Sequence, residues 1–349
     1  MSDKKKKPQW LGKLLKYGIP LIVSAGLCYL LFMGIDYREM LDVVRRQCNF
    51  NWLLLMMAIA VLSHVCRAAR WRIQLKALHV DAPFYVLVYS IFGTYAVNLV
   101  FPRLGEIWRT GYIAQRQNAR FTTVFGSMVA DRLADTVTVV LILCLTLLVA
   151  SGPILDYLSR NGETFAGAVA FLRSPWLWCV FVLCAAAAWL LLTVRSNLRW
   201  INVVQKVVKD LWAGFAVVFH MPGTLRWLLF SAGIWGCYFL QMYVSFYAFP
   251  FTAELLSAYG VAPALVAFTL SSISMGVPSN GGIGPWQWAV IFALGIYGTG
   301  QVEAAAFANL VLGCNTLLLV VLGIITFAGI ALDRRRTAGI NNKEIRNNK

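Results

Sequence analysis

Long apolar runs separated by short polar segments make up most of the chain. A helical run of about 20 apolar residues crosses the hydrocarbon core of a bilayer. Such runs predict six full spans, at about 17–35, 51–66, 123–150, 176–194, 225–249 and 305–331. The pattern therefore predicts an all-α polytopic membrane protein.

Two further apolar stretches are each interrupted by proline and glycine. The first covers 84–115 and breaks at Pro102 and Gly105, and the second covers 261–298 and breaks over 278–285. Proline removes a backbone donor, and glycine permits backbone conformations that end a helix. Each stretch is therefore predicted to form a helical hairpin.

The charges beside the first stretch indicate which way it turns. Segments 67–83 and 102–122 each carry a net charge of +3, and short loops rich in Lys and Arg stay in the cytoplasm. A segment with two cytoplasmic flanks enters the membrane and returns, which predicts a re-entrant hairpin. The 18 residues of 84–101 are also long enough to span, which is the alternative.

Two re-entrant hairpins give one consistent topology. The predicted fold class is all-α, with about six full spans and two re-entrant helical hairpins that enter from opposite faces; the alternative is about 8–9 spans without re-entry. The net-positive segments then share one side: 1–16, 67–83, 102–122, 195–224 and 333–349. Both termini are predicted to be cytoplasmic, with a basic N-terminus (1–16), one membrane domain (17–331) and a basic tail (332–349).

The two breaks also resemble each other. Pro102 and Gly105 have the same three-residue spacing as Pro278 and Gly281. Broken helices in inverted repeats that meet at the middle of the membrane are typical of transporters. The spacing therefore raises the hypothesis of an inverted repeat.

Composition agrees with a membrane protein. Only 13% of the 349 residues are charged, against about 25% in soluble domains. The net charge of +16 lies between apolar segments, where it fixes topology and attracts anionic lipid, so no nucleic-acid partner is expected. The eight cysteines show no metal-site spacing, and no metal or cofactor is expected.

The first charged group directly follows the break at Pro102. Arg103, Glu106 and Arg109 are three residues apart, so neighbouring members lie close together on a helix. Arginine forks bind phosphate oxygens in pairs, which predicts a pocket for a phosphate-bearing headgroup. The alternative is a cytoplasmic cluster that anchors the chain to lipid phosphates.

The second charged group lies early in an apolar run. Asp131 and Asp135 share one helix face, and Arg132 and Asp135 are three residues apart. A charge deep in the bilayer costs at least about 2.5–3.5 kcal/mol, so such residues usually pair and face a cavity. We predict a role in the site, with Asp135 as a hypothetical proton-linked switch; the alternative is a structural ion pair near the interface.

The second break is rich in glycine. Exposed backbone amides at Gly281, Gly282 and Gly284 can form an anion-binding nest. The alternative is a simple turn between two membrane segments. Arg67, Arg70 and nearby Arg72 are interpreted as an interfacial anchor at the end of the second helix.

Motifs in sequence order carry a family resemblance. They are Arg70-Trp71-Arg72, Asn98 with Pro102-Arg103-Leu104-Gly105-Glu106 and Arg109, Asp131-Arg132 with Asp135, and Pro278 with Gly281-Gly282-Ile283-Gly284. Together they resemble the flippase-like membrane domain of lysylphosphatidylglycerol synthases, over about 10–331. The resemblance implies movement of a phospholipid between leaflets.

The resemblance leaves the substrate open. In the two-domain synthases a separate soluble domain makes the aminoacylated lipid, and that domain is not expected here. Some relatives are linked to polyprenyl-phosphate sugars. Members commonly carry a glutamate where this chain has Gln287, which implies a different, purely anionic lipid if that carboxylate recognises a cationic headgroup.

We therefore expect an inner-membrane lipid flippase and, because no catalytic signature is evident, not an enzyme. The expected substrate-binding residues are Asn98, Arg103, Glu106, Arg109, Asp131, Arg132, Asp135, Gly281, Gly282, Gly284 and Gln287. The alternative is a membrane subunit that scaffolds a lipid-modifying or glycosyltransferase enzyme partner. A third hypothesis is a transferase that acts on polyprenyl phosphate.

Overall fold

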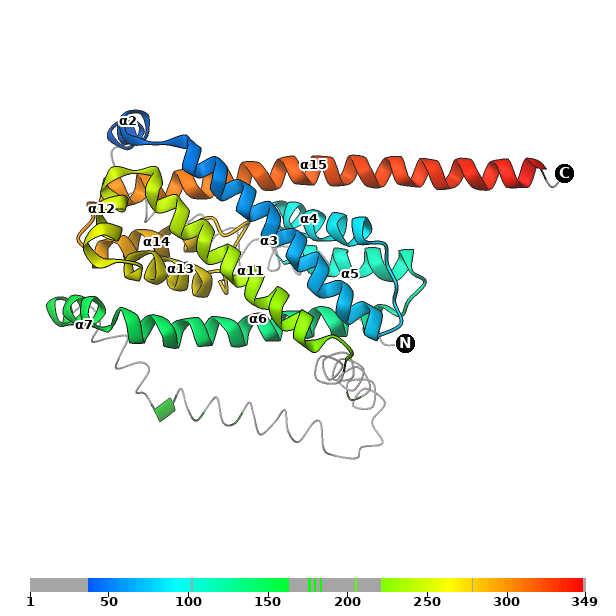
Figure 1. Cartoon of the computed structure of the whole chain (residues 1–349), viewed down its shortest axis with the longest axis horizontal. Coiled ribbons are helices and arrows are strands. Elements are labelled where there is room, and N and C mark those ends of the chain that lie inside the picture. The colour runs from blue at the N-terminus through cyan, green and yellow to red at the C-terminus, as the bar shows by residue number, and fades with distance from the viewer. Residues whose placement is uncertain are drawn as a thin grey trace, which may run out of the picture.

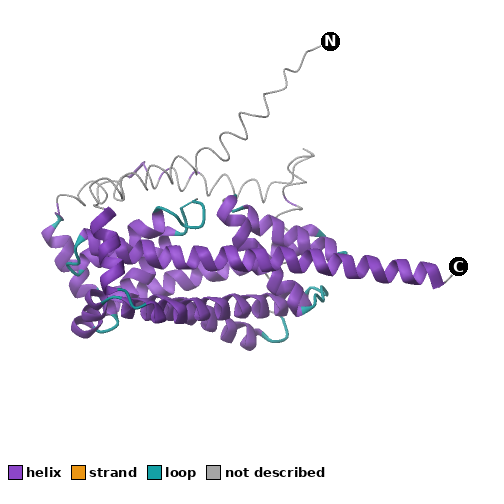
Figure 2. Ribbon diagram, turned by 90° about the horizontal axis from the view of Figure 1, so that it is seen from above, coloured by secondary structure: helices purple, strands orange, loops and turns teal. Residues whose placement is uncertain are grey.

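The computed structural model describes residues 37–101, 103–162, 221–277 and 279–347, with single residues between 175 and 205. This part of the chain is helical apart from short connections (Figure 2). Figure 1 labels the main helices. Their bounds are α2 Tyr37–Gln47, α3 Phe50–Ala77, α4 Phe84–Val100, α5 Leu104–Arg116, α6 Phe121–Val149, α7 Ser151–Arg160, α11 Thr224–Ser245, the 3-10 turn η1 Phe246–Ala248, α12 Pro250–Tyr259, α13 Ala262–Ser274, α14 Pro285–Ile296 and α15 Gln301–Asn347.

Four helices of the described chain are long and apolar enough to cross a membrane. They are Phe50–Ala77, Phe121–Val149, Thr224–Ala248 and Gln301–Asp333. They confirm the spans predicted near 51–66, 123–150, 225–249 and 305–331. The spans predicted at 17–35 and 176–194 lie largely or wholly outside the described residues. The protein is thus a multi-pass membrane protein, and the described part of the chain contains helices and no strand.

Helices α3 and α11 form an antiparallel pair at the centre of the molecule (Figure 1). At one end the Asn49 amide donates to the Ala248 carbonyl over 2.8 Å. Toward the other end, Arg70 Nη1 donates to Ser231 Oγ over 3.2 Å. Helix α6 joins this pair through Trp71, whose Nε1 donates to Ser127 Oγ over 3.0 Å. These three helices, together with the α4–α5 hairpin, hold the interior polar groups described below.

Helices α4 and α5 form the first predicted hairpin. Near the turn, Asn98 Oδ1 accepts from the Gly105 amide at 2.8 Å. At the open end, Arg116 Nη2 donates to the Tyr85 hydroxyl over 3.3 Å. A Cβ at Gly105 would overlap the Thr94 carbonyl oxygen, so glycine permits this close antiparallel packing. Pro102 lies outside the described residues.

Helices α13 and α14 form the second predicted hairpin, and they pack on each other. The connection between them, 275–284, contains Gly281, Gly282 and Gly284, with φ of 61°, 86° and 93°. These left-handed angles favour glycine. Pro285 then opens α14 at its first turn, where the missing proline donor is harmless.

Helix α12 was not predicted. The sequence pattern predicts an external connection over 250–260, with Glu254 as its only charge. The structure forms a helix there, and the side of the membrane on which it lies stays a prediction. Pro250 begins α12, and Gly260 with φ of 63° allows the chain to turn. Helices α12 and α13 are bent by 111° and could form a broken span or a re-entrant loop.

The turns of the two hairpins touch each other. We call 101–103 the first break and 275–284 the second break. Arg103 Nη2 donates to the Gly276 carbonyl. A Cβ at Gly281 would lie 2.6 Å from Leu99 Cδ2 at the end of α4. Two segments far apart in sequence thus meet inside one bundle.

Helix α15 runs antiparallel to α4. Asp333 pairs with Arg116 beside the start of α4, and a Cβ at Gly323 would lie 2.5 Å from Ala96 Cβ near its end. Beyond 333 the helix continues through most of the segment predicted as a basic tail, and it extends past the other helices (Figures 1 and 2).

The helix order places connections of like charge together. Figure 1 shows the end of α3, the α5–α6 connection and the start of α11 at one end of the molecule, and α2, α7 and α12 at the other. The first group belongs to segments predicted to be net positive. The second belongs to segments predicted to be neutral or acidic.

Candidate functional site

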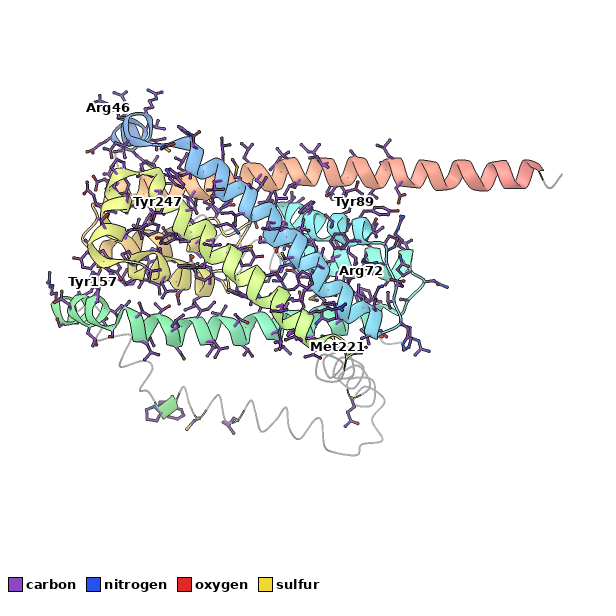
Figure 3. All side chains as sticks on the ribbon, viewed as in Figure 1. Arg46, Arg72, Tyr89, Tyr157, Met221 and Tyr247 are labelled. Carbon is purple, nitrogen blue, oxygen red and sulfur yellow. The ribbon has the colours of Figure 1, made fainter. Side chains whose placement is uncertain are left out.

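Helix α3 carries two arginines into the interior of the molecule. Arg67 and Arg70 are 3% and 0% exposed. Both were interpreted as part of an interfacial anchor, and that interpretation is wrong. The helix does not end at 66 but continues to Ala77, so its last turns hold Arg67 and Arg70 against α6 and α11. Arg72, which is labelled in Figure 3, lies on another face of the helix. Its guanidinium carbon lies 6.0 Å from the centroid of the Phe84 ring.

The two arginines pair with two aspartates of α6. Arg70 Nη2 lies 2.6 Å from Asp131 Oδ1 and 2.8 Å from Asp135 Oδ1. Arg67 Nη1 lies 2.8 Å from Asp135 Oδ2 and 3.5 Å from Asp131 Oδ2. Arginines three residues apart thus face aspartates four residues apart, and both spacings keep the side chains on one helix face.

These ion pairs lie well inside the helices rather than at their ends. At 1.5 Å per residue, Asp131 is about 15 Å and Asp135 about 21 Å from the start of α6. Arg70 is about 10 Å from the end of α3. The described structure therefore does not match a purely interfacial anchor.

Helix α11 completes the surroundings of the aspartates with aromatic and hydroxyl groups. Tyr238 accepts from Arg67 Nε at 3.3 Å, and its hydroxyl lies 3.3 Å from that of Tyr95. Trp235 Nε1 donates to Asp135 Oδ1 over 3.4 Å. The position of these side chains beside the aspartates is hard to predict from the sequence, because aromatic residues are common throughout the apolar runs.

The α4–α5 hairpin adds a third carboxylate. Glu106 Oε1 lies 3.0 Å from Arg132 Nη2 of α6, and Asn98 Nδ2 donates to Glu106 Oε2 over 3.3 Å. The side chains of Arg132 and Glu106 are 39% and 19% exposed, so this pair is the most accessible part of the group. Arg132 also lies 3.9 Å from Asp135, which connects it to the buried pairs.

Arg109 of α5 differs from the other buried arginines because its guanidinium lacks hydrogen-bond partners in the described part of the chain. It is 0% exposed, yet its Nε, Nη1 and Nη2 have no hydrogen-bond partner among the described residues. Its guanidinium carbon lies 4.4 Å from the ring centroid of Trp71. The charges that act on it include Asp131, Arg132 and Glu106. Buried polar groups are normally hydrogen-bonded, so an unsatisfied guanidinium calls for an explanation.

We call these seven residues the ion cluster: Arg67, Arg70, Glu106, Arg109, Asp131, Arg132 and Asp135. It contains four arginines and three carboxylates. With all groups ionised its net charge is +1. Each carboxylate has an arginine partner, and one arginine is left over.

The structure divides the predicted site residues into three groups. Glu106, Arg109 and the three charged residues of α6 come together in the ion cluster, with Asn98 beside it. Arg103 is exposed and bonds to the second break. Gly281 and Gly282 shape that break, packing near Leu99 and Met275.

Gln287 has a different set of contacts. Its Oε1 accepts from the Gly284 amide at 2.9 Å, which caps α14. Its Nε2 donates to Asn309 of α15. The structure therefore shows Gln287 joining α14 to α15.

The sequence prediction missed Arg67 and Arg70. The spacing of the charges could have indicated the pairing. Arg67 and Arg70 lie on one face of a helix, and Asp131 and Asp135 lie on one face of another. It was overlooked because the second helix was ended too early. Among the residues that the structure describes, no group of histidine, cysteine and acidic side chains could hold a metal ion.

The comparisons with known proteins agree with the resemblance noted in the sequence. The family model described as "Lysylphosphatidylglycerol synthase TM region" matches residues 18–323, which is most of the chain. No curated protein and no solved structure matches significantly. On the strength of the family match, together with the multi-pass helical fold, the chain belongs to the lysylphosphatidylglycerol synthase TM region family.

Proposed function

We propose that the protein is an inner-membrane lipid transporter, and not an enzyme, that moves a phosphate-bearing lipid between leaflets. The lipid is of the phospholipid or polyprenyl-phosphate type. The single observation that carries the proposal is the ion cluster, with its excess arginine buried between membrane-spanning helices. Family membership supports the same class of function.

A buried ion cluster is costly to maintain in a protein with a purely structural role. Desolvation of a charge costs several kcal/mol, and replacing buried ion pairs with apolar residues is often neutral or stabilising. Charged groups within membrane spans usually mark the path of a substrate or ion. The cluster is therefore better explained by substrate handling than by packing.

The proposed topology keeps the two hairpins re-entrant. Helix α4 has 17 residues, which extend for about 25 Å and fall short of the hydrocarbon thickness of about 30 Å. The contact between Arg103 and Gly276 supports a meeting of the two breaks inside the bilayer. We propose six full spans, hairpins that enter from opposite faces as an inverted repeat, and cytoplasmic termini.

Each group of predicted residues has a role in this proposal. Arg109 holds the lipid phosphate. Glu106 and the α6 charges Asp131, Arg132 and Asp135 shape and gate the site, with Asn98 orienting Glu106. Arg103 and the glycine-rich second break, supported by Gln287, close the site from the other side.

Leaflet exchange in reconstituted vesicles tests the proposal. The full chain is inserted into vesicles that carry fluorescent lipids, and the label of the outer leaflet is quenched chemically. We expect the inner-leaflet label to become quenchable faster than in protein-free vesicles. Exchange no faster than in protein-free vesicles, for every phospholipid and polyprenyl phosphate tried, would refute the transport function.

The scaffolding alternative predicts a different interior. A subunit that only holds a lipid-modifying or glycosyltransferase partner is expected to have an apolar interior with polar groups at the rims. Arg70, Arg109 and Asp131 are fully buried, which favours transport.

A further inference from the structure

We infer that Arg109 recognises a single negative phosphate charge, so that the transported lipid has a net-anionic headgroup and a net-cationic headgroup is rejected. The inference rests on the proposed function and specifies its substrate class. Three observations carry it: the arginine–carboxylate pairs of the ion cluster, the position of Arg109 against Trp71, and the net charge of +1 of the ion cluster.

Among the described residues, Arg109 is the arginine of the ion cluster that has no ion pair and no hydrogen bond from any of its nitrogens. Arg67 and Arg70 are occupied by the two aspartates, and Arg132 by Glu106. The three nitrogens of Arg109 have no acceptor among the described residues, although the side chain is completely buried. A ligand with oxygen acceptors would satisfy this group.

The surroundings of Arg109 favour an acceptor in the plane of its guanidinium. Trp71 lies against it at 4.4 Å from guanidinium carbon to ring centroid and is itself anchored by its bond to Ser127. In this cation–π contact the guanidinium lies over the face of the indole ring, and none of its nitrogens has an acceptor among the described residues. Two phosphate oxygens match that planar fork.

The net charge of the ion cluster sets the charge of the preferred headgroup. One phosphodiester anion cancels the excess charge of +1 that results from four arginines and three carboxylates. A headgroup with added ammonium groups needs a free carboxylate. Within the ion cluster, every carboxylate already has an arginine at 3.0 Å or less. Asp131 is held by this ion pairing alone, because its carboxylate oxygens accept no hydrogen bond among the described residues, but it is 0% exposed, so an ammonium group would have to displace an arginine to reach a carboxylate.

The accessible pair beside Arg109 supplies an entry point. Glu106 precedes Arg109 by one helical turn on α5, and its bond to Arg132 is partly exposed. An incoming phosphate can approach Arg109 past this partly exposed pair while Glu106 stays bonded to Arg132. Glu106 then remains unavailable to an ammonium group, and its negative charge disfavours a second anionic group on the headgroup.

Lipid binding by the purified full chain tests the inference without requiring transport. Native mass spectrometry compares phosphatidylglycerol, phosphatidylethanolamine and lysyl-phosphatidylglycerol with identical acyl chains. We expect phosphatidylglycerol to bind at least about tenfold more tightly than the lysyl lipid. Arg109→Gln is expected to abolish that preference, and Arg109→Lys to retain part of it because the charge remains without the fork.

Controls separate a specific site from general charge effects. Arg160→Gln removes an exposed arginine of α7 and is expected to leave the preference unchanged. Glycerol phosphate is tested in place of lipid, and weaker binding than that of phosphatidylglycerol assigns the site to a lipid headgroup. Equal or tighter binding of glycerol phosphate would overturn the lipid assignment.

The results distinguish this inference from the proposed function. Equal binding of anionic and cationic lipids, or a preference unchanged in Arg109→Gln, overturns the inference even if leaflet exchange is observed. A preference that depends on Arg109, without any exchange in vesicles, supports the recognition of anionic headgroups by Arg109 and refutes transport.

Discussion

At the scale of single residues, Arg70 and Arg109 show how different two buried arginines can be. Both are 0% exposed. Arg70 contacts two aspartates and a serine, whereas Arg109 has an aromatic ring and no hydrogen-bond acceptor among the described residues. Arg70 therefore stabilises the fold. The buried charge of Arg109 destabilises it, because desolvation is not offset by a paired acceptor, and a bound anion would supply that acceptor.

Replacing Arg70 should destabilise the protein strongly. Arg70→Met leaves Asp131 and Asp135 with too few positive partners, and breaking a buried ion pair in this way typically costs about 3–5 kcal/mol. We expect a clear fall in the thermal unfolding temperature of the detergent-purified protein. An unfolding temperature like that of the wild type would mean that the pairs seen in the structure contribute little.

Replacing Arg109 should have the opposite effect. Arg109→Met loses a cation–π contact of about 2 kcal/mol at most, but removes an unpaired buried charge whose desolvation costs several kcal/mol. We expect unchanged or higher thermal stability in lipid-free detergent together with loss of anionic-lipid binding. A fall as large as that of Arg70→Met would assign Arg109 a structural role.

At the scale of elements, the α4–α5 hairpin depends on how closely its helices approach. Gly105 lies against the backbone of Thr94, and Gly93 lies against the ring of Trp108. The first break needs more than a proline, because Arg103 adopts φ of 59° there. The hairpin therefore rests on small residues at particular contacts as well as on the apolar pattern.

Gly105→Ala and Gly111→Ala form a matched pair of tests on α5. A methyl group at Gly105 overlaps the Thr94 carbonyl, so we expect a loss of stability of about 1–3 kcal/mol. At Gly111 no heavy atom of the described residues lies within 4 Å of the added Cβ, and alanine favours a helix by up to about 1 kcal/mol. Thermal unfolding of both variants checks the hairpin packing, and equal effects would contradict it.

At the scale of the whole molecule, the fold gathers connections of like charge at the same end. The connections at the end of α3 and between α5 and α6 lie together (Figure 1), and both belong to segments with net charge +3. The α12 and α14–α15 connections belong to the opposite, nearly uncharged group. The positive-inside rule then predicts that the first group faces the cytoplasm.

Single cysteines in a cysteine-free background test this orientation. Cysteines at Asp81 and Asn118 should react with a membrane-impermeant maleimide only from the cytoplasmic side, because the hairpin returns the chain to the side it left. Cysteines at Tyr259 and Thr299 should react only from the other side. Labelling of positions 81 and 118 from different sides would contradict the hairpin, and reversal of all four would contradict the assigned orientation.

Much of the architecture was predictable because membrane helices leave a strong apolar signal. Helix ends were harder to predict. Arg67 and Arg70 resemble the basic flank of a helix, and the sequence alone does not show the carboxylates that would allow them to lie inside. Helix α12 was missed for a related reason, since ten residues that begin with a proline and carry a single charge resemble a connection.

The sequence by itself determined the class of protein, four of its described spans, the two interrupted hairpins and the side on which basic segments gather. These properties depend on local composition. A helix that crosses the hydrocarbon core must be apolar over about 20 residues, and short loops rich in Lys and Arg stay on one side of the membrane. Only the tertiary structure decided which charges meet. Pairing depends on helix faces that come together across more than 60 residues of chain. That is why Asp131 and Asp135 have partners on α3, and why Arg109, a predicted phosphate ligand, is left as the unpaired charge.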